Sequence, residues 1–101
     1  MDHSPLPHLF LYGRPGCHLC DDSRALVTAI LDERHATGLP VPAVVERDIT
    51  TDPEWQRAFF TTIPVLALGD SRLELALSAA KIRRLLADVL DAPTAATPAN
   101  P

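Results

Sequence analysis

The sequence predicts a small α/β domain (α+β in some classification schemes) with a four-stranded mixed sheet and helices on both faces. Three observations predict it: short apolar runs bounded by Gly or Pro, stretches with helical period, and a late Leu–polar alternation. A chain of 101 residues has room for one domain with a modest core. We expect the domain to span residues 8–91, with flexible termini at 1–7 and 92–101.

The first half of the chain predicts a β-α-β unit. Residues 9–12 are wholly apolar and end at Gly13, which is typical of a strand buried on both faces. From Cys17 the apolar residues recur with helical period, and Gly38 is a natural stop, so we expect a helix over about 17–37. Residues 41–48 predict a second strand, parallel to the first through a right-handed crossover.

A short second helix and a third strand follow. Asp52 can cap a helix whose first position is Pro53. Trp55 and Phe59 lie one turn apart on it, and we expect them to pack in the core. The third strand should begin at or just after Pro64, because proline is excluded from the middle of a central strand.

A hairpin and a last helix complete the predicted order β-α-β-α-β-β-α. Residues 69–71 predict the turn. Beyond it Leu73, Leu75 and Leu77 alternate with other residues, which predicts a fourth strand with one buried face. Ser78 is then placed to cap an amphipathic helix, whose apolar positions are Ile82, Leu85, Leu86, Val89 and Leu90.

Charge and hydropathy exclude two classes of partner. The net charge is −4, and no segment concentrates Lys or Arg, so we expect no nucleic-acid partner. No apolar run approaches the roughly 20 residues of a membrane span. The N-terminus also lacks the basic start and apolar block of a secretory signal. We therefore expect a cytoplasmic protein with no membrane partner, and a monomer.

The only two cysteines, Cys17 and Cys20, lie at the predicted start of the first helix. Unpaired backbone N–H groups at a helix start favour a thiolate, which is the attacking species, so Cys17 is the candidate nucleophile. Cys20 lies one turn further along, close enough to form a disulfide with Cys17 and to resolve a mixed disulfide. Arg14 adds positive charge nearby, whereas Asp21 opposes it.

Three other interpretations of the cysteine pair stand beside this one. A structural disulfide would be kept reduced in the cytoplasm. A zinc site within one chain lacks a second cysteine pair, and the four histidines are scattered and expected on the surface: His3, His8, His18 and His35. We therefore expect no metal held by one chain. Metal or iron–sulfur binding by the cysteine pairs of two chains remains an alternative.

Three segments together make the chain resemble the glutaredoxin-like branch of the thioredoxin superfamily, in particular small bacterial proteins with a Cys-His-Leu-Cys motif. They are residues 11–20, residues 48–53 and the Thr-Ile-Pro-Val of residues 62–65. The resemblance implies a thioredoxin/glutaredoxin-like fold and a thiol–disulfide oxidoreductase that uses Cys17 and Cys20. It further implies that Pro64 follows a cis peptide bond beside Cys17, that the backbone of Ile63 pairs with the substrate, and that Arg14 lies near the reactive thiol.

The sequence also departs from the pattern of this family. Between the cysteines it has His-Leu where glutaredoxins usually have Pro-Tyr, and Gly16 stands where thioredoxins have Trp. Residues 77–81 lack the Gly-Gly and acidic residue of the family's glutathione pocket. We expect no bound cofactor, a disulfide-containing protein or small molecule as substrate, and glutathione or a thioredoxin-reductase-type enzyme as electron donor. The missing pocket also motivates an alternative, a non-catalytic binding module of the thioredoxin fold.

Overall fold

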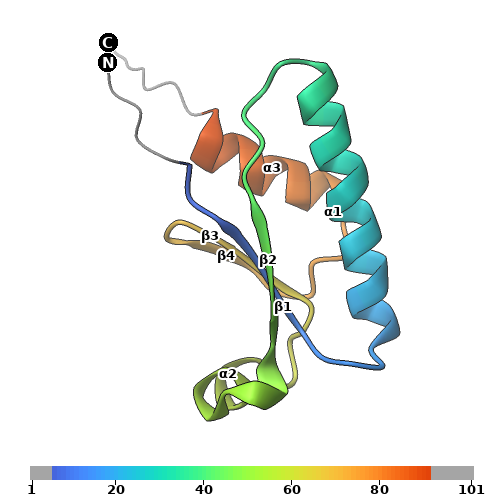
Figure 1. Ribbon diagram of the computed structural model, residues 1–101, viewed down its shortest axis with the longest axis vertical. Coiled ribbons are helices and arrows are strands. Elements are labelled where there is room, and N and C mark those ends of the chain that lie inside the picture. The colour runs from blue at the N-terminus through green and yellow to red at the C-terminus, as the bar shows by residue number, and fades with distance from the viewer. Residues whose placement is uncertain (1–5, 92–101) are drawn as a thin grey trace.

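A computed structural model describes residues 6–91. The predicted flexible segment 92–101, and residues 1–5 of the predicted flexible segment 1–7, lie outside the described residues. The observed order is β-α-β-α-β-β-α, as predicted, with one short 3-10 turn added after the second strand (Figure 1). The elements are β1 (Leu9–Gly13), α1 (His18–Ala36), β2 (Val44–Asp48), the 3-10 turn (Ile49–Thr51), α2 (Pro53–Phe59), β3 (Val65–Leu68), β4 (Ser71–Leu73) and α3 (Ala79–Leu90).

The four strands form one mixed sheet in the order β2-β1-β3-β4. β1 pairs with β2 in parallel, and β3 pairs in antiparallel fashion with both β1 and β4. The parallel β-α-β unit and the antiparallel hairpin were both predicted, and both are confirmed. The two cysteines lie where β1 ends and α1 begins.

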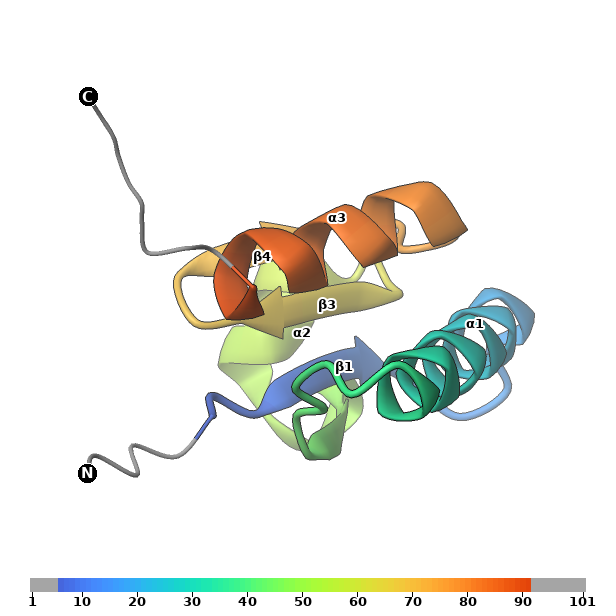
Figure 2. The same cartoon turned by 90° about the horizontal axis from the view of Figure 1, so that it is seen from above.

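Alternate residues of the central strands pack against different helices. Leu9 and Leu11 of β1 belong to a buried cluster with residues of α1, β3 and α3. Tyr12, on the other face of the same strand, packs with Phe59 of α2. Successive side chains of a strand point to opposite faces, so the sheet is covered on both sides, as predicted. The views agree: α1 and α2 lie on opposite sides of the strands, and α3 lies along β3 and β4 (Figures 1 and 2).

Side-chain caps explain where the helices begin. Asp52 accepts a hydrogen bond from the Glu54 amide at 2.8 Å, and Pro53 is the first residue of α2. Ser78 accepts one from the amide of Lys81 at 3.2 Å, at the start of α3. These predicted starts are confirmed, because each cap satisfies an amide that has no partner within its helix.

The predicted fourth strand is wrong beyond Leu73. β4 ends there, and Leu75 adopts a positive φ of 49° with its side chain 52% exposed. The amide of Leu75 donates to the carbonyl of Thr62 and the amide of Ala76 to that of Pro64, at 3.0 and 2.8 Å. The chain therefore leaves the sheet and turns along the loop before β3, which buries Ala76 and exposes Leu75 and Leu77. A local alternation of leucines carries no information about these tertiary hydrogen bonds.

The second strand is shorter than the predicted span of 41–48. It begins at Val44, although pairing with β1 starts one residue earlier, where the Leu9 amide donates to the Ala43 carbonyl at 2.8 Å. Pro40 and Pro42 lack an N–H group and cannot extend the ladder in the N-terminal direction.

Phe59 and Trp55 occupy the core as expected, to different degrees. Phe59 is buried, whereas Trp55 is partly buried and its ring lies edge-on to that of Tyr12. Within residues 6–91, none of the helices combines the length and the apolar character that a membrane crossing requires.

Candidate functional site

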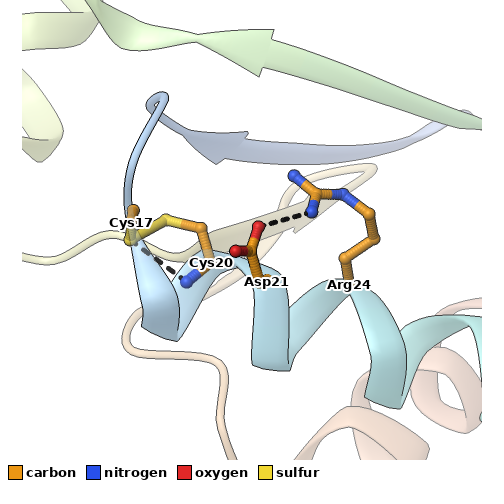
Figure 3. Close-up of a disulfide and its surroundings, with 4 residues drawn as sticks. All are labelled: Cys17, Cys20, Asp21 and Arg24. Carbon is orange, nitrogen blue, oxygen red and sulfur yellow. Dashed lines mark hydrogen bonds and ion pairs between the residues drawn. A yellow bond between two sulfur atoms is a disulfide. The ribbon is translucent and has the colours of Figure 1, made fainter.

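Cys17 and Cys20 lie in the first turn of α1 and form a disulfide (Figure 3). Cys17 is the N-cap, with an extended backbone, and Cys20 lies within the helix. Their Cα atoms are 5.2 Å apart, which is within the ordinary range for bridged cysteines. The structure thus places both sulfurs at the helix start, as the sequence predicted.

The sulfur of Cys17 takes the role that a capping oxygen plays in other helices. The backbone N–H of Cys20 donates to Cys17 Sγ at 3.1 Å. The first amides of a helix have no partner within it and carry a partial positive charge. A negative charge on this sulfur would therefore be stabilised by a donated hydrogen bond and by the field of the helix.

Burial distinguishes the two sulfurs. Cys17 is only partly buried, whereas Cys20 is 1% exposed. A substrate can therefore approach Cys17 directly, while Cys20 is reached through Cys17.

Gly13 makes room for the buried sulfur. A Cβ atom at this position would lie 2.9 Å from Cys20 Sγ and 3.2 Å from Cys20 Cβ. Only a glycine at the end of β1 lets the first turn of α1 pack this closely. From the sequence, Gly13 was predicted only to end the first strand. The spacing of Gly13 and Cys20 along the chain does not reveal that the two residues are in contact.

A pocket of about 290 Å³ lies beside the pair, between the loop after β1, the start of α1 and β2. Arg14, Cys20 and Glu46 are among its lining residues. Arg14 is exposed, and no carboxylate within residues 6–91 forms an ion pair with it. Its guanidinium is therefore available to an anionic group that approaches the cysteines from this side.

Arg24 joins the start of α1 to the edge strand. It donates to Asp21 and to Glu46, each at 2.8 Å (Figure 3 shows the first contact). The hydrogen bond to Glu46, followed by that to Asp21, raises the pKa of Arg24 above its ordinary value. Asp21 was expected to oppose a thiolate at Cys17, and the Arg24 charge offsets part of that opposition. The link that Arg24 makes to β2 was not predicted from the sequence, because its partner Glu46 is 22 residues away.

The other predicted binding residues lie before β3. The peptide bond between Ile63 and Pro64 is cis, and both residues are buried. Ile63 belongs to the same buried cluster as Cys20, and Cys17 packs against that cluster. The Ile63 amide donates to the Phe59 carbonyl at 3.1 Å, so the Ile63 carbonyl is the backbone group that a substrate chain could use.

The histidines among the described residues lie on the surface. His8, His18 and His35 are exposed, as expected, and His3 falls outside the described residues. Across residues 6–91, no group of three or more His, Cys, Asp or Glu side chains is arranged to hold a metal ion.

Comparisons with known proteins agree with this fold. A search of curated proteins finds no match. Among solved structures, the solution NMR structure of protein Ne2328 from Nitrosomonas europaea matches with a TM-score of 0.64 and 22% identity. That match covers 84% of this chain and 96% of the other, and shows that the fold is thioredoxin-like. The family described as "Glutaredoxin-like domain (DUF836)" matches residues 8–90. With its cysteine pair at the helix start, which supports a thiol–disulfide redox role, the chain belongs to this glutaredoxin-like family.

Proposed function

We propose that the protein is a thiol–disulfide oxidoreductase that reduces or exchanges disulfides through the Cys17/Cys20 dithiol. One observation carries the proposal: the partly exposed sulfur of Cys17 caps α1 and accepts the Cys20 amide at 3.1 Å, with the second sulfur buried behind it. A capping sulfur of this kind is activated as a thiolate and is open to attack a substrate.

The reaction balances in two exchange steps. The Cys17 thiolate attacks one sulfur of a substrate disulfide, which forms a mixed disulfide and releases the other substrate sulfur as a thiolate that takes up a proton. Cys20 then loses its proton and attacks Cys17 Sγ, which closes the Cys17–Cys20 disulfide and releases the second substrate thiol. The protein loses two electrons and two protons, and the substrate disulfide gains them.

The substrate would bind over the surface that surrounds Cys17. In this proposal the Ile63 carbonyl pairs with the backbone of a disulfide-containing protein, Pro64 borders the reacting sulfurs, and Arg14 attracts an anionic group near the disulfide. The electron donor is a thiol: glutathione, or the dithiol of a thioredoxin-reductase-type enzyme. We place the activity in the cytoplasm, where the pair is returned to the dithiol form that it needs.

The first test measures the reactivity of Cys17 against pH. In a Cys20→Ser variant, we expect the iodoacetamide alkylation rate of Cys17 to reach half its maximum clearly below the ordinary thiol pKa of about 8.5. Below that midpoint the thiol is protonated and the rate falls. The same variant in denaturant serves as the control and should titrate at the ordinary value. A folded protein that also titrates near 8.5 would refute the activated nucleophile.

The second test asks whether the pair turns over. The wild-type protein should reduce an artificial disulfide with glutathione or thioredoxin reductase as donor, tested in parallel, and Cys17→Ser should abolish the activity. Cys20→Ser should instead accumulate a mixed disulfide, detectable by mass spectrometry, because no second thiol resolves it. Absence of any reduction that depends on Cys17 would favour the non-catalytic binding module. Metal in the purified wild type but not in Cys17→Ser would favour the metal or iron–sulfur alternative.

A further inference from the structure

Ser23 holds an unpaired hydroxyl inside the protein. Ser23 is 0% exposed, and its Oγ has no hydrogen-bond partner among residues 6–91. A buried polar group without a partner is costly, so such groups are few in folded proteins and each requires an explanation. Alanine would fill nearly the same space without that cost.

The position of Ser23 relates it to Cys20. The two residues are three apart in α1, which places their Cβ atoms about 5–6 Å apart on one face. Helical side chains lean toward the N-terminus of the helix, which for Ser23 is the direction of the turn that contains Cys20. The next three buried residues of the helix, Val27, Ile30 and Leu31, are apolar. Cys20 is therefore the neighbour on this face whose hydrogen-bonding capacity changes with redox state.

We propose that Ser23 is a positioning residue of the redox pair, whose hydroxyl hydrogen-bonds to Cys20 when the disulfide is reduced. Reduction adds two electrons and two protons to the pair, drawn from a dithiol donor, and converts the bridged Cys20 sulfur into a free thiol. That thiol can donate its S–H to Ser23 Oγ, and the thiolate that forms during the resolving step can accept the Ser23 O–H. The bridged sulfur has no proton to donate.

The consequence is a bias in the redox equilibrium. The disulfide form contains the unpaired hydroxyl and the dithiol form does not, so Ser23 destabilises the oxidised protein relative to the reduced one. The inference rests on the proposed function in treating the cysteines as a couple that cycles between these two forms. It deepens that function by naming a residue that sets how readily the disulfide is reduced.

The experiment equilibrates the protein with reduced and oxidised dithiothreitol and counts free thiols by maleimide labelling and mass spectrometry. Ser23→Ala removes the unpaired group from the oxidised form and the new hydrogen bond from the reduced form. We expect the equilibrium constant for reduction to fall about tenfold, in keeping with the cost of one unpaired buried hydroxyl. Thr28→Ala is the matched control, because it removes an exposed hydroxyl from the same helix, and should leave the constant unchanged. Ser23→Thr restores the hydroxyl and should return the constant toward the wild-type value.

Thermal unfolding separates this role from simple packing. In Ser23→Ala the oxidised form should gain unfolding temperature relative to wild type, whereas the reduced form should not gain. Equal shifts in both forms, with an unchanged redox constant, would overturn the proposal and leave Ser23 with a packing role alone.

The outcome is independent of the outcome for the proposed function. Equilibration with dithiothreitol requires no protein substrate and no reductase. A shifted constant in a protein that reduces no substrate would reject the oxidoreductase and keep Ser23 as a residue that tunes the pair. An active enzyme whose constant is unmoved by Ser23→Ala would keep the oxidoreductase and reject the role of Ser23.

Discussion

The two ends of α1 differ in whether their polar groups have hydrogen-bond or ion-pair partners. At the C-terminal end Arg34 is 6% exposed, and each of its three guanidinium nitrogens donates a hydrogen bond. Nε donates to the Pro40 carbonyl at 2.8 Å, and the two terminal nitrogens donate to the carboxylate of Asp91 at 3.1 and 2.5 Å. At the N-terminal end Cys17 is partly exposed, Arg14 has no ion-pair partner within residues 6–91, and the buried Ser23 hydroxyl is unpaired.

This difference suggests a division of roles within one helix: the C-terminal end contributes to stability, and the N-terminal end carries the proposed chemistry. Arg34 joins α1 to the loop that follows it, six residues away, and to Asp91, the C-cap of α3, which is 57 residues away. At the start of α1, by contrast, lie the groups to which we assign the proposed roles, contact with a substrate and a change of hydrogen-bond partner with redox state. The same helix can thus be anchored at one end and reactive at the other.

The largest expected loss of stability comes from removing Arg34 at the C-terminal end of α1. Arg34→Ala would leave the Asp91 carboxylate, itself only partly buried, without its partner and remove the hydrogen bond to Pro40. Loss of one member of a buried ion pair costs about 3–5 kcal/mol, and the partial exposure of Asp91 places the expectation near about 3 kcal/mol. Urea unfolding of the oxidised and reduced proteins should show the same loss in both forms.

The matched control for this change is Arg83→Ala. Arg83 pairs with Glu33 at 3.1 Å on the exposed surface of the same region, so its loss should cost less than about 1 kcal/mol. If Arg34→Ala also altered the redox equilibrium of the cysteines, the two ends of α1 would be coupled. The division of roles between them would then be rejected.

A smaller loss of stability is expected from adding a methyl group at Gly13, beside the cysteine pair. Gly13→Ala would place a Cβ atom against Cys20 Sγ, which the disulfide holds in place. Overpacking of this kind costs about 1–3 kcal/mol, so we expect about 2 kcal/mol from urea unfolding of the oxidised protein. In the reduced protein the Cys20 sulfur can rotate away, and the loss should be smaller. Equal destabilisation of both forms would show that the clash is with Cys20 Cβ rather than with the sulfur.

The smallest effect is expected at the exposed network between the two ends. Arg24→Ala removes the contacts with Asp21 and Glu46, in which all three side chains are substantially exposed. Surface pairs contribute about 0.2–1 kcal/mol and are screened by salt. The stability difference from wild type, measured by urea unfolding, should therefore stay below about 1 kcal/mol and shrink as salt is added. A loss that persists in high salt would mean that the alkyl chain of Arg24 contributes by packing.

Local patterns predicted the elements where local physics sets them. The cap residues Asp52 and Ser78 act within three residues of their own position, and both helix starts were predicted. The Leu73–Leu75–Leu77 alternation failed, because hydrogen bonds to Thr62 and Pro64 decided the path of that loop. Arg34, Gly13 and Ser23 were not singled out, since their roles depend on partners or packing that the neighbouring sequence does not reveal.

The amino-acid sequence by itself determined the order of the elements, the faces that the helices bury and the position of the cysteines at the start of α1. Those features follow from periodicity, capping and backbone geometry, all of which act over a few residues. Only the tertiary structure decided that Cys20 is buried against Gly13, that Arg34 reaches Asp91, and that the Ser23 hydroxyl has no partner among the described residues. Each of these depends on how close two segments come in space, and that closeness is set by the packing of the whole domain.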